Sequence, residues 1–475
     1  MKLPNDIASC HAIILLLQKE VALLTQKVVA LEERLNKNSR NSNKPPSTDG
    51  LSKPPKIQAA FPKQKGKKSG GQPKHKGKTL GMVQNADQQI VLLASHCSCG
   101  QALDDSTLNL TVLEKRQVFD IPEPKLEVTE FQKMGGNCSN CGTYHKGTFP
   151  QRVKARVQYG TRIKTLAVLL NTHFKVPLKK ISTLFSDLYG YAVNQSTIVK
   201  ATKKCSVALK DRQETIKQAL LKSQVVHCDE SGVRVSGKLH WLHTVSNKHF
   251  TYLFVHPKRG KEALLDEVSL LPQLTKNQWA VHDCWMSYFS FDNCKHALCG
   301  AHLLRELTAL VEQNSSWASL FKDYLLALYQ LTNKGLGALQ TKQKQSALYL
   351  YEQLCKYANE EEPPPQKSSS GRGKPKSTKG RNLLKRLVKH QSAVLAFAFH
   401  EEVPFTNNQA ERDLRPIKTK LKVAGCFRTL SGAQIYACIQ AFISTIRKQQ
   451  RSVFSELQFA LEAKPFALHQ SNPPK

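Results

Sequence analysis

Three acidic residues, each in a different local pattern, constrain this chain more than any other feature. Asp229 follows the apolar run at 224–228, Asp283 follows a second run at 278–282, and Glu411 lies in a stretch of helix-forming residues. A fold that brings these three elements together would place three carboxylates at one site. Carboxylate oxygens are the protein ligands that Mg²⁺ and Mn²⁺ prefer, and a pair of such ions can activate water or a hydroxyl for in-line attack on a phosphodiester. We therefore take these residues as candidate magnesium ligands.

The pattern around the first two acids predicts a sheet with helices. Strands are expected at 225–229, 240–245 and 250–255, joined by turns at 236–238 and 246–248, as an antiparallel meander. A helix from Lys261, a strand ending at Asp283, a short strand at 296–299 and a helix around 303–307 follow. This β-β-β-α-β-α order is that of an RNase H-like α/β core.

The remaining C-terminal half completes this core. Residues 216–310 would form its first part, and residues 395–450, which carry Glu411, its last part. Residues 311–394 read as a helical insertion between the two parts, interrupted by a basic loop at 366–381 that is rich in Ser, Gly and Lys. Residues 451–475 are expected to form a C-terminal tail. The chain as a whole is therefore predicted to be a multidomain α+β protein.

The N-terminal segment, residues 11–37, carries a heptad repeat. Ile14, Val21, Val28 and Leu35 occupy position a, and Leu17, Leu24 and Leu31 occupy position d. Branched residues at a with Leu at d favour a parallel two-stranded coiled coil, which predicts a homodimer. The alternative is a helix that packs against its own chain.

A basic segment follows at residues 38–80. Between Lys37 and Lys78 the chain has twelve Lys or Arg and one acid, Asp49, in a composition too polar to form a core. The whole chain has a net charge of +34, which indicates a polyanionic partner such as DNA. The segment is either a solvated linker or an arm that contacts DNA phosphates. The candidate contacts are Lys65, Lys67, Lys68, Lys74, Lys76 and Lys78.

Two cysteine pairs mark residues 81–150 as a zinc-ribbon-like module. Cys97 and Cys99 form the first pair, and Cys138 and Cys141 form the second. Four thiolates suit tetrahedral zinc, although only the second pair has the usual C-x2-C spacing. The alternative to a zinc site is buried free thiols. Within a zinc site, His96 or His145 is a candidate to replace one of the cysteine ligands. The 13 cysteines are an odd number spread over the chain, which fits a reducing compartment better than a disulfide framework.

Residues 151–215 are predicted to be helical. Apolar residues recur at helical spacing around 166–170 and 181–188, Gly190 breaks the chain, and a polar cap at 194–197 precedes a third helix. The layout resembles a helix-turn-helix, which would make this a DNA-binding domain. An ordinary helical subdomain has the same pattern.

Motifs along the whole chain together resemble one family. They are residues 38–42 with 44–47, residues 70–73 with His75, Lys76 and Gly77, the two cysteine pairs, Tyr159 with Gly160, Asp229 with Glu230, Asp283, Cys299 with His302, residues 407–412 with Arg415 and Pro416, and residues 425–428. On these motifs the chain resembles the insertion-sequence-66 family of bacterial transposases, from the coiled coil to the C terminus. Departures are the C-x-C first pair, Ser231 where family members often have Thr, and Lys74 where they often have Gly.

The resemblance implies a transposase of the DDE type with an RNase H-like core. Asp229, Asp283 and Glu411 would then be the catalytic acids, with Mg²⁺ or Mn²⁺ as cofactor and Zn²⁺ in a structural role. His302, of the motif beside the active site, would contact the scissile phosphate, whereas the alternative is a core cysteine with a hydrogen-bonded histidine. Arg412 and Arg415 would bind DNA phosphate near Glu411 or pair with nearby acids; Glu411 and Arg415 are spaced for a helical i,i+4 pair.

A zinc site made from Cys294, His296, Cys299 and His302 is not expected. These residues lie within nine positions of each other, but a strand that runs into a helix points its side chains in different directions.

The expected function is to bind terminal inverted repeats, cleave DNA and join the freed end to target DNA. Expected partners are DNA, a second copy of the chain and accessory proteins of the same element, in the cytoplasm at the bacterial nucleoid. No membrane partner is expected, because no apolar run reaches the roughly 18 residues of a spanning helix. Two alternatives are a catalytically inactive DNA-binding protein descended from a transposase, and an RNase H-like nuclease without strand transfer.

Overall fold

The computed structural model describes residues 6–35, 37, 41–42, 80–103, 111–332, 338–365 and 377–467. These residues belong to two compact units. The first comprises Met1–Pro62, Arg152–Thr183 and Ala192–Lys475, and the second comprises Lys63–Gln151 and Leu184–Tyr191. Most of the predicted basic arm, including its six candidate lysines, lies outside the described residues.

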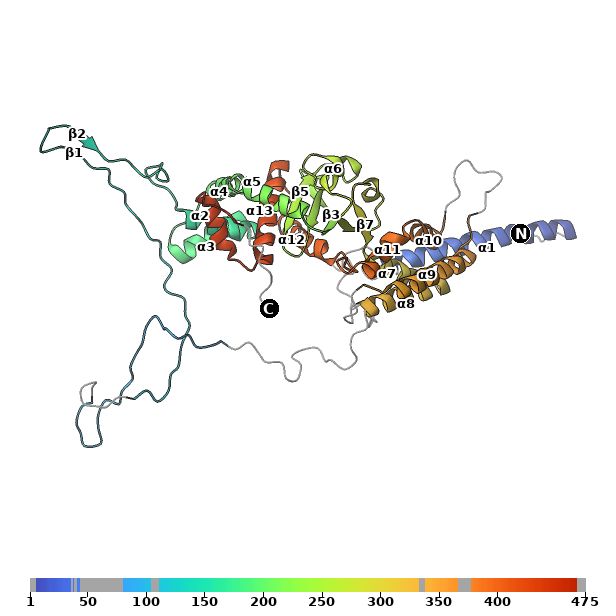
Figure 1. Cartoon of the computed structure of the whole chain (residues 1–475), viewed down its shortest axis with the longest axis horizontal. Coiled ribbons are helices and arrows are strands. Elements are labelled where there is room, and N and C mark those ends of the chain that lie inside the picture. The colour runs from blue at the N-terminus through green and yellow to red at the C-terminus, as the bar shows by residue number, and fades with distance from the viewer. Residues whose placement is uncertain are drawn as a thin grey trace. The chain divides into compact units, whose positions relative to one another are not determined.

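A five-stranded mixed sheet forms the centre of the first unit (Figure 1). Its strands are β3 (Val225–Val235), β4 (Lys238–Ser246), β5 (Thr251–His256), β6 (Trp279–His282) and β7 (Lys295–Leu298), in the spatial order β5-β4-β3-β6-β7. Strands β3, β4 and β5 pair antiparallel, which confirms the predicted meander. Strands β6 and β7 run parallel to β3.

Strand β3 extends six residues beyond its predicted end at Asp229. The prediction ended the strand at the acidic pair, but both acids remain in register with β4, where Asp229 pairs with Thr244 and Glu230 with His243. The strand ends at the predicted turn, where Ser236 and Gly237 have φ angles of 48° and 77°. Two successive positive φ values are typical of the two-residue turns that join twisted antiparallel strands.

Helices from distant parts of the chain pack on one face of the sheet. They are α2 (Thr161–Thr172), α4 (Gln195–Ala208), α5 (Lys210–Leu221), the short α6 (Lys261–Leu265) and α14 (Val453–Leu461); α3 (Leu178–Tyr189) lies between α2 and α4 in the chain. Helix α13 (Leu430–Lys448) contributes side chains to the cores on both faces of the sheet. Val226 of β3 shares a hydrophobic core with Val168 of α2, Ala201 of α4, Phe442 of α13 and Leu457 of α14.

This shared core corrects two predicted boundaries. The helices at 151–215 were expected to form a domain of their own, but α2, α4 and α5 complete the core of the sheet. Residues 451–475 were expected to be a tail, but α14 begins at a Ser452 cap, whose side chain accepts a hydrogen bond from the Ser455 backbone, and buries Leu457. Both segments bury apolar residues that neither could cover alone.

Helix α12 (Asn408–Ala424) packs on the opposite face, where Leu414 and Ile417 contact the core formed by Val233 and Val235 of β3. Beyond β7 a helical layer contains α7 (Gly300–Val311), α8 (Ser316–Leu331), α9 (Thr341–Glu361), α10 (Lys379–Lys389) and α11 (Gln391–Phe399). The predicted insertion at 311–394 is thus helical. Its basic loop was expected to reach 381, but α10 starts at Lys379 because the Thr378 side chain caps the Arg381 N–H.

The N-terminal helix α1 (Ile7–Leu35) contains the predicted heptads. The a and d side chains at Ile14, Leu17, Val21, Leu24 and Val28 are all exposed in the single chain. The helix is therefore confirmed, and its pairing with a second copy stays a prediction. Within the described residues, no helix has the length and apolar character needed to cross a membrane.

Candidate active site

The register of the parallel strands places Asp229 and Asp283 side by side. Val225 of β3 is paired with Trp279 of β6, and the pairing continues to His227 and Val281. The same register, extended by two residues, sets Asp229 opposite Asp283. Active sites in sheets of this kind form where parallel strands end. The sheet therefore brings together two of the three predicted acids.

Asp229 lies in a buried and negatively charged environment. Burial is the main cause that raises its pKa, to about 7, and the neighbouring carboxylates of Glu230 and Asp283 also contribute to this rise. One oxygen accepts a hydrogen bond of 2.8 Å from the Glu230 N–H. A cation binds favourably between close carboxylates of this kind, because its positive charge offsets the repulsion between their negative charges.

Glu230 follows Asp229 in sequence but is already neutralised. Its Oε1 accepts a 2.8 Å hydrogen bond from Arg259 Nε, and its Oε2 accepts one of 2.6 Å from the Tyr288 hydroxyl. The Arg259 guanidinium lies 4.8 Å from the ring centre of Trp241 and 4.3 Å from that of Trp285. Both oxygens of Glu230 are therefore bonded to neighbouring side chains, whereas Asp229 accepts only a backbone hydrogen bond from the described residues.

The third acid, Glu411, is brought to this edge by the start of α12. Asn407, directly before the helix, is buried and makes three contacts with residues in or next to the sheet. Its Nδ2 donates to the Cys228 carbonyl at 2.7 Å, its Oδ1 lies 3.0 Å from His227 Nδ1, and its backbone N–H donates to the Cys299 sulfur at 3.1 Å. Burial lowers the pKa of His227 to about 4, so its ring is neutral. Asn407 thereby ties the start of α12 to the first half of β3 and to Cys299, directly after β7.

We expect Asn407→Ala to lower the free energy of unfolding by about 2–4 kcal/mol, because it leaves the Cys228 carbonyl and the His227 ring nitrogen buried without partners. Urea unfolding of the full chain measures this change. The control is Asn408→Ala, at the exposed next position, which should change the free energy by less than about 0.5 kcal/mol. Equal stabilities for the two variants would contradict the role given to Asn407.

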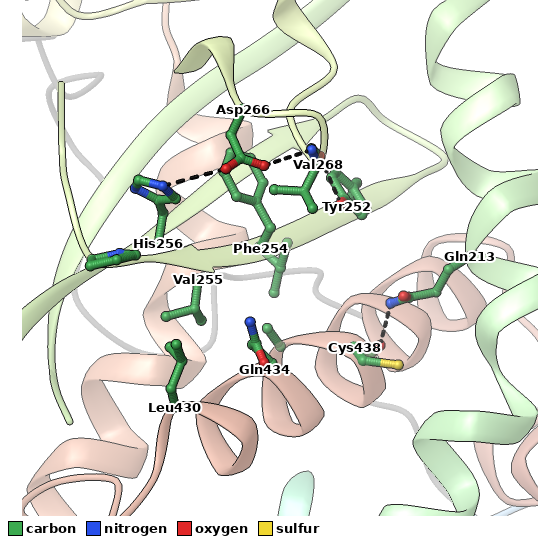
Figure 2. A pocket seen from close by; sticks show the side chains of 13 residues that line it. Gln213, Tyr252, Phe254, Val255, His256, Asp266, Val268, Leu430, Gln434 and Cys438 are labelled. Atoms are coloured by element: carbon green, nitrogen blue, oxygen red, sulfur yellow. Dashed lines mark hydrogen bonds and ion pairs between the residues drawn. The ribbon is translucent and has the colours of Figure 1, made fainter. Parts of the chain in front are cut away.

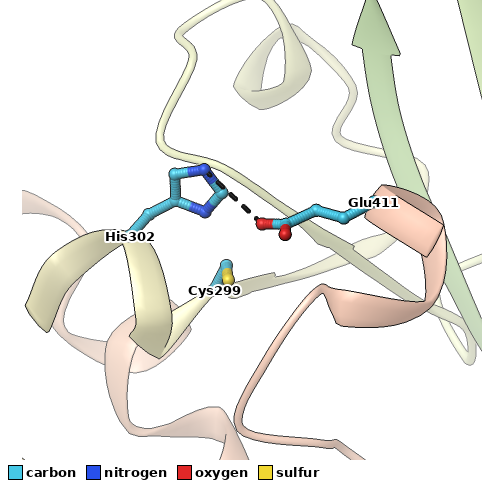
Figure 3. Close-up of side chains that lie close together, drawn as sticks. All are labelled: Cys299, His302 and Glu411. Carbon is cyan, nitrogen blue, oxygen red and sulfur yellow. Dashed lines mark ion pairs between the residues drawn. The ribbon is translucent and has the colours of Figure 1, made fainter. Parts of the chain in front are cut away.

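Glu411 lies beside His302 of α7 (Figure 3), and Arg305 of the same helix is also near it. Its Oε1 is 3.9 Å from His302 Nε2 and 3.8 Å from Arg305, and it accepts no hydrogen bond from a described residue. Burial lowers the pKa of His302, but the Cys299 sulfur and the Glu411 carboxylate raise it more, to about 9. His302 and Arg305 are spaced i,i+3 and so lie on one face of the helix. This spacing is present in the sequence, but the prediction included only His302.

The three acids do not form one tight group of ligand atoms. Atoms of Cys299, His302 and Glu411 lie within 4.8 Å of one another, whereas those of Asp229, Asp283 and Glu411 do not. Two-metal sites hold their ions about 3.5–4 Å apart, so carboxylates at the two ends of such a site need not touch.

The two arginines predicted near Glu411 are both exposed. Arg412 is exposed and its Nε donates to the Asn408 carbonyl at 3.2 Å. Arg415 is also exposed, and within the described part of the chain it makes no ion pair with Glu411 or another acid. The simple i,i+4 pair is therefore not formed.

The predicted zinc ligands lie in separate turns of the second unit. The N–H of Gly100 donates to the Cys97 carbonyl at 2.9 Å, and that of Gly142 to the Cys138 carbonyl at 2.8 Å, where the second turn joins β1 (Gly135–Asn137) to β2 (Tyr144–Lys146). Among the residues that the structure describes, no group of three ligand atoms includes a cysteine of these pairs. The zinc site stays a prediction.

A separate pocket of about 450 Å³ lies at the β5 edge of the sheet, between β5 and α13 (Figure 2). Its lining includes Tyr252, Phe254 and Gln434, and an ion pair of 3.5 Å joins His256 to Asp266. None of the three predicted acids lines this pocket, so it is not part of the candidate active site.

Comparison with known families identifies the family of this chain. The model of the family described as "Transposase IS66 family" matches residues 156–435, which include all three acids, His302 and Asn407. A model of a family of unknown function matches residues 5–80. No curated protein matches the chain. Because the transposase model covers more than half of the sequence, the chain belongs to the IS66 family of transposases, which are DNA-processing enzymes.

Proposed function

We propose that this chain is a DDE transposase that cleaves DNA at the ends of its element and joins the freed 3′-hydroxyl to target DNA. The observation that carries the proposal is the position of Asp229 beside Asp283, just beyond the last parallel pair of β3 and β6, with Glu411 tied to this region by Asn407. The sheet order β5-β4-β3-β6-β7, antiparallel in its first three strands and parallel in the last two, supports an RNase H-like core.

The residues present fit divalent cations. The pKa of Asp229 is raised by burial and by neighbouring carboxylates, and Glu411 Oε1 is a buried oxygen that accepts no hydrogen bond from a described residue. Asp229, Asp283 and Glu411 would hold Mg²⁺ or Mn²⁺, and Glu230 would not, because Arg259 and Tyr288 occupy its oxygens. When bound, the ions would activate the attacking oxygen and stabilise the leaving one.

The chain's own side chains have separate tasks in this proposal. Asp229 of β3 and Asp283, directly after β6, supply negative charge side by side, and Asn407 orients the helix that presents Glu411. His302 and Arg305 place two positive charges beside Glu411, where they can neutralise non-bridging oxygens of the scissile phosphate. Arg259 pairs with Glu230, and this ion pair reduces the repulsion between the Glu230 carboxylate and the reacting phosphate.

Membership of a transposase family implies DNA binding, and the net charge of +34 agrees with it. The finer assignments are proposals: the arm at 38–80 contacts phosphates, α2 to α4 read the element's ends, α1 pairs two copies, and the cysteine pairs hold structural zinc. Accessory proteins of the same element and an association with the nucleoid belong to the same proposal.

The test supplies the full-length chain with duplexes that carry the inverted repeats flanking its gene. Mg²⁺ should support cleavage to a 3′-hydroxyl and joining to a second duplex, EDTA should abolish both reactions, and Ca²⁺ should permit binding with little chemistry because its coordination is looser. Gel separation of end-labelled strands measures each product. Cleavage without joining would favour a nuclease, and binding without either reaction would favour an inactive DNA-binding protein.

A further inference from the structure

Three side chains from different elements converge beside the candidate active site (Figure 3). Cys299 lies directly after β7, His302 in the first turn of α7 and Glu411 in the first turn of α12. One ligand atom of each, namely the sulfur, a ring nitrogen and a carboxylate oxygen, lies within 4.8 Å of the other two. Within the described part of the chain, no other set of His, Cys, Asp and Glu side chains meets this condition. We call these three residues the Cys299 cluster.

The backbone around Cys299 holds the cluster in place. The Cys299 N–H donates to the His282 carbonyl at 2.9 Å, and the Cys299 carbonyl accepts from the His302 N–H at 3.1 Å. The Gly300 N–H donates to the Phe405 carbonyl at 2.8 Å, and a Cβ at Gly300 would overlap the Phe405 ring. Glycine at this position therefore lets the segment before α12 approach the start of α7. A ligand that binds the cluster would have to order few groups.

Two atoms of the cluster are buried without a hydrogen-bond partner. Nδ1 of His302 and Oε1 of Glu411 make no hydrogen bond with a described residue. The nitrogen-bearing edge of the His302 ring faces the Glu411 carboxylate (Figure 3). Buried polar atoms without partners are rare in folded proteins, and an ion is one of the groups that satisfies them.

The sulfur of the cluster is supported in a way that suits a metal ligand. Cys299 is buried, and its sulfur accepts a hydrogen bond of 3.1 Å from the Asn407 backbone N–H. A cysteine that binds a metal carries negative charge on its sulfur, so a donor directed at the sulfur stabilises the bound form.

The neighbours of Cys299 in the sequence do not belong to the cluster. Both ring nitrogens of His296 are engaged elsewhere, Nδ1 with His282 Nε2 at 2.9 Å and Nε2 with the Phe291 carbonyl at 2.7 Å. The third ligand comes instead from α12, far along the chain.

The chemistry of the three donors selects a class of metal. Mg²⁺ prefers oxygen ligands, whereas a thiolate together with an imidazole is typical of Zn²⁺. Three protein ligands leave the fourth tetrahedral position open to water or to a phosphate oxygen. The cluster therefore differs from the proposed Mg²⁺ site in its metal and in two of its ligands, although Glu411 belongs to both.

We propose that Cys299, His302 and Glu411 form a Zn²⁺ site whose occupation inhibits the enzyme. A zinc ion in this site takes Glu411 from the catalytic ions and His302 from the scissile phosphate. The binding of zinc stands on the cluster alone. The inhibition rests on the proposed function, because it takes Glu411 and His302 as parts of the catalytic site. The site is separate from the zinc site predicted at the two cysteine pairs of the second unit.

The first test measures metal binding to the full chain in the absence of DNA. Co²⁺ serves as the probe, because its near-ultraviolet absorption reports a bond between the metal and a sulfur. Cys299→Ser and His302→Gln should each lose the part of this absorption that comes from the cluster, and after dialysis against Zn²⁺ each should retain one zinc ion fewer per chain than the wild type. The two cysteine pairs are unchanged in both variants, so their contribution cancels. Circular dichroism checks that each variant folds.

Two control variants assign the metal to the cluster. Cys284→Ser removes a half-buried thiol next to Asp283 and should keep the wild-type spectrum. Asp229→Asn removes a proposed Mg²⁺ ligand but no member of the cluster, so it should also keep the spectrum. The proposal is overturned if Cys299→Ser and His302→Gln both bind Co²⁺ and Zn²⁺ as the wild type does, or if Asp229→Asn loses the absorption.

The second test measures inhibition. Cleavage of an end-bearing duplex in excess Mg²⁺ is titrated with Zn²⁺, and each rate is divided by the zinc-free rate of the same variant. Loss of a partner that only supports a metal ligand weakens metal binding by about 10–100-fold, so loss of the ligand itself should cost at least as much. Cys299→Ser should therefore need at least about 10-fold more Zn²⁺ for half inhibition than the wild type or Cys284→Ser.

The two tests separate this inference from the proposed function. If the wild type binds Zn²⁺ through the cluster but cleaves nothing with Mg²⁺, the zinc site stands and the proposed function fails. If the wild type cleaves DNA and the variants bind zinc as the wild type does, the proposed function stands and the zinc site fails. Equal inhibition of Cys299→Ser and the wild type would overturn the inhibitory role.

Discussion

Replacing Asp229 or Asp283 with Asn should lower the rate of DNA strand cleavage by about 10³-fold or more while leaving DNA binding within about twofold. Each change removes one carboxylate ligand but no cation and little volume. Bound metal ions contribute several kcal/mol of transition-state stabilisation, and about 4 kcal/mol corresponds to a 10³-fold rate. Glu411→Gln should have the same effect. Single-turnover cleavage with excess protein measures the rate.

Asp292→Asn is the matched control, because Asp292 is an exposed aspartate in the loop before β7. This variant should cleave at the wild-type rate. Near-normal cleavage by Asp229→Asn, Asp283→Asn or Glu411→Gln would remove that residue from the site.

Loss of activity at Asp229 should be accompanied by a gain in stability. The pKa of this carboxyl is raised in the folded chain, so folding binds its proton more tightly and the folded state loses stability as pH rises from about 4 to about 7. Asn removes this penalty. In metal-free buffer at pH 8, Asp229→Asn should therefore raise the free energy of unfolding, by about 1–3 kcal/mol. A variant that is inactive because it misfolds would be less stable than the wild type. The sign of the change in the free energy of unfolding therefore distinguishes loss of a ligand from misfolding.

The second large effect is expected at the N-terminal helix. Leu24→Lys with Val28→Lys places charges at adjacent d and a positions of the predicted coiled coil, where a second copy would bury them against each other. The dimer should weaken by at least about 100-fold, and joining of paired ends should fall with it. Sedimentation of the full chain measures the change in association.

The control for the coiled coil is Gln26→Lys with Ala30→Lys, which adds the same charge at heptad positions f and c, away from the seam. This variant should remain a dimer. If Leu24→Lys with Val28→Lys also sediments as a dimer and joins paired ends normally, α1 is not the assembly device.

The local patterns were sufficient to predict the strands of the central sheet, but not the parallel register that sets Asp229 beside Asp283. Strand 225–229 and the run before Asp283 were both apolar, and a parallel pair with a register of 54 positions sets their acids side by side. The position of Glu411 could not be predicted either, because it depends on Asn407, which forms hydrogen bonds with residues about 180 positions earlier. A contact over such a separation leaves no periodic signal in one sequence.

Other parts of the site were missed for the same reason. Arg259 and Tyr288 pair with Glu230 from 29 and 58 positions away, and nothing local to the acidic pair indicated which carboxylate would be neutralised. The predictions of a tail at 451–475 and of a separate helical domain at 151–215 were wrong because the apolar faces of both segments pack against the sheet. The residues of neither segment indicate this partner. Arg305 was the exception, since its i,i+3 spacing from His302 was visible.

The most direct test of the central claim exchanges the proposed metal ligands for thiols. Asp229→Cys and Asp283→Cys, in the full chain, are assayed for strand cleavage with Mg²⁺ and with Mn²⁺. A thiolate is a poor ligand for Mg²⁺ and a better one for the softer Mn²⁺. If these residues hold the ions, both variants should be inactive with Mg²⁺ and should regain cleavage with Mn²⁺, whereas wild type is active with either ion. Cleavage by the Cys variants at the wild-type rate in Mg²⁺ would contradict the assignment of this site.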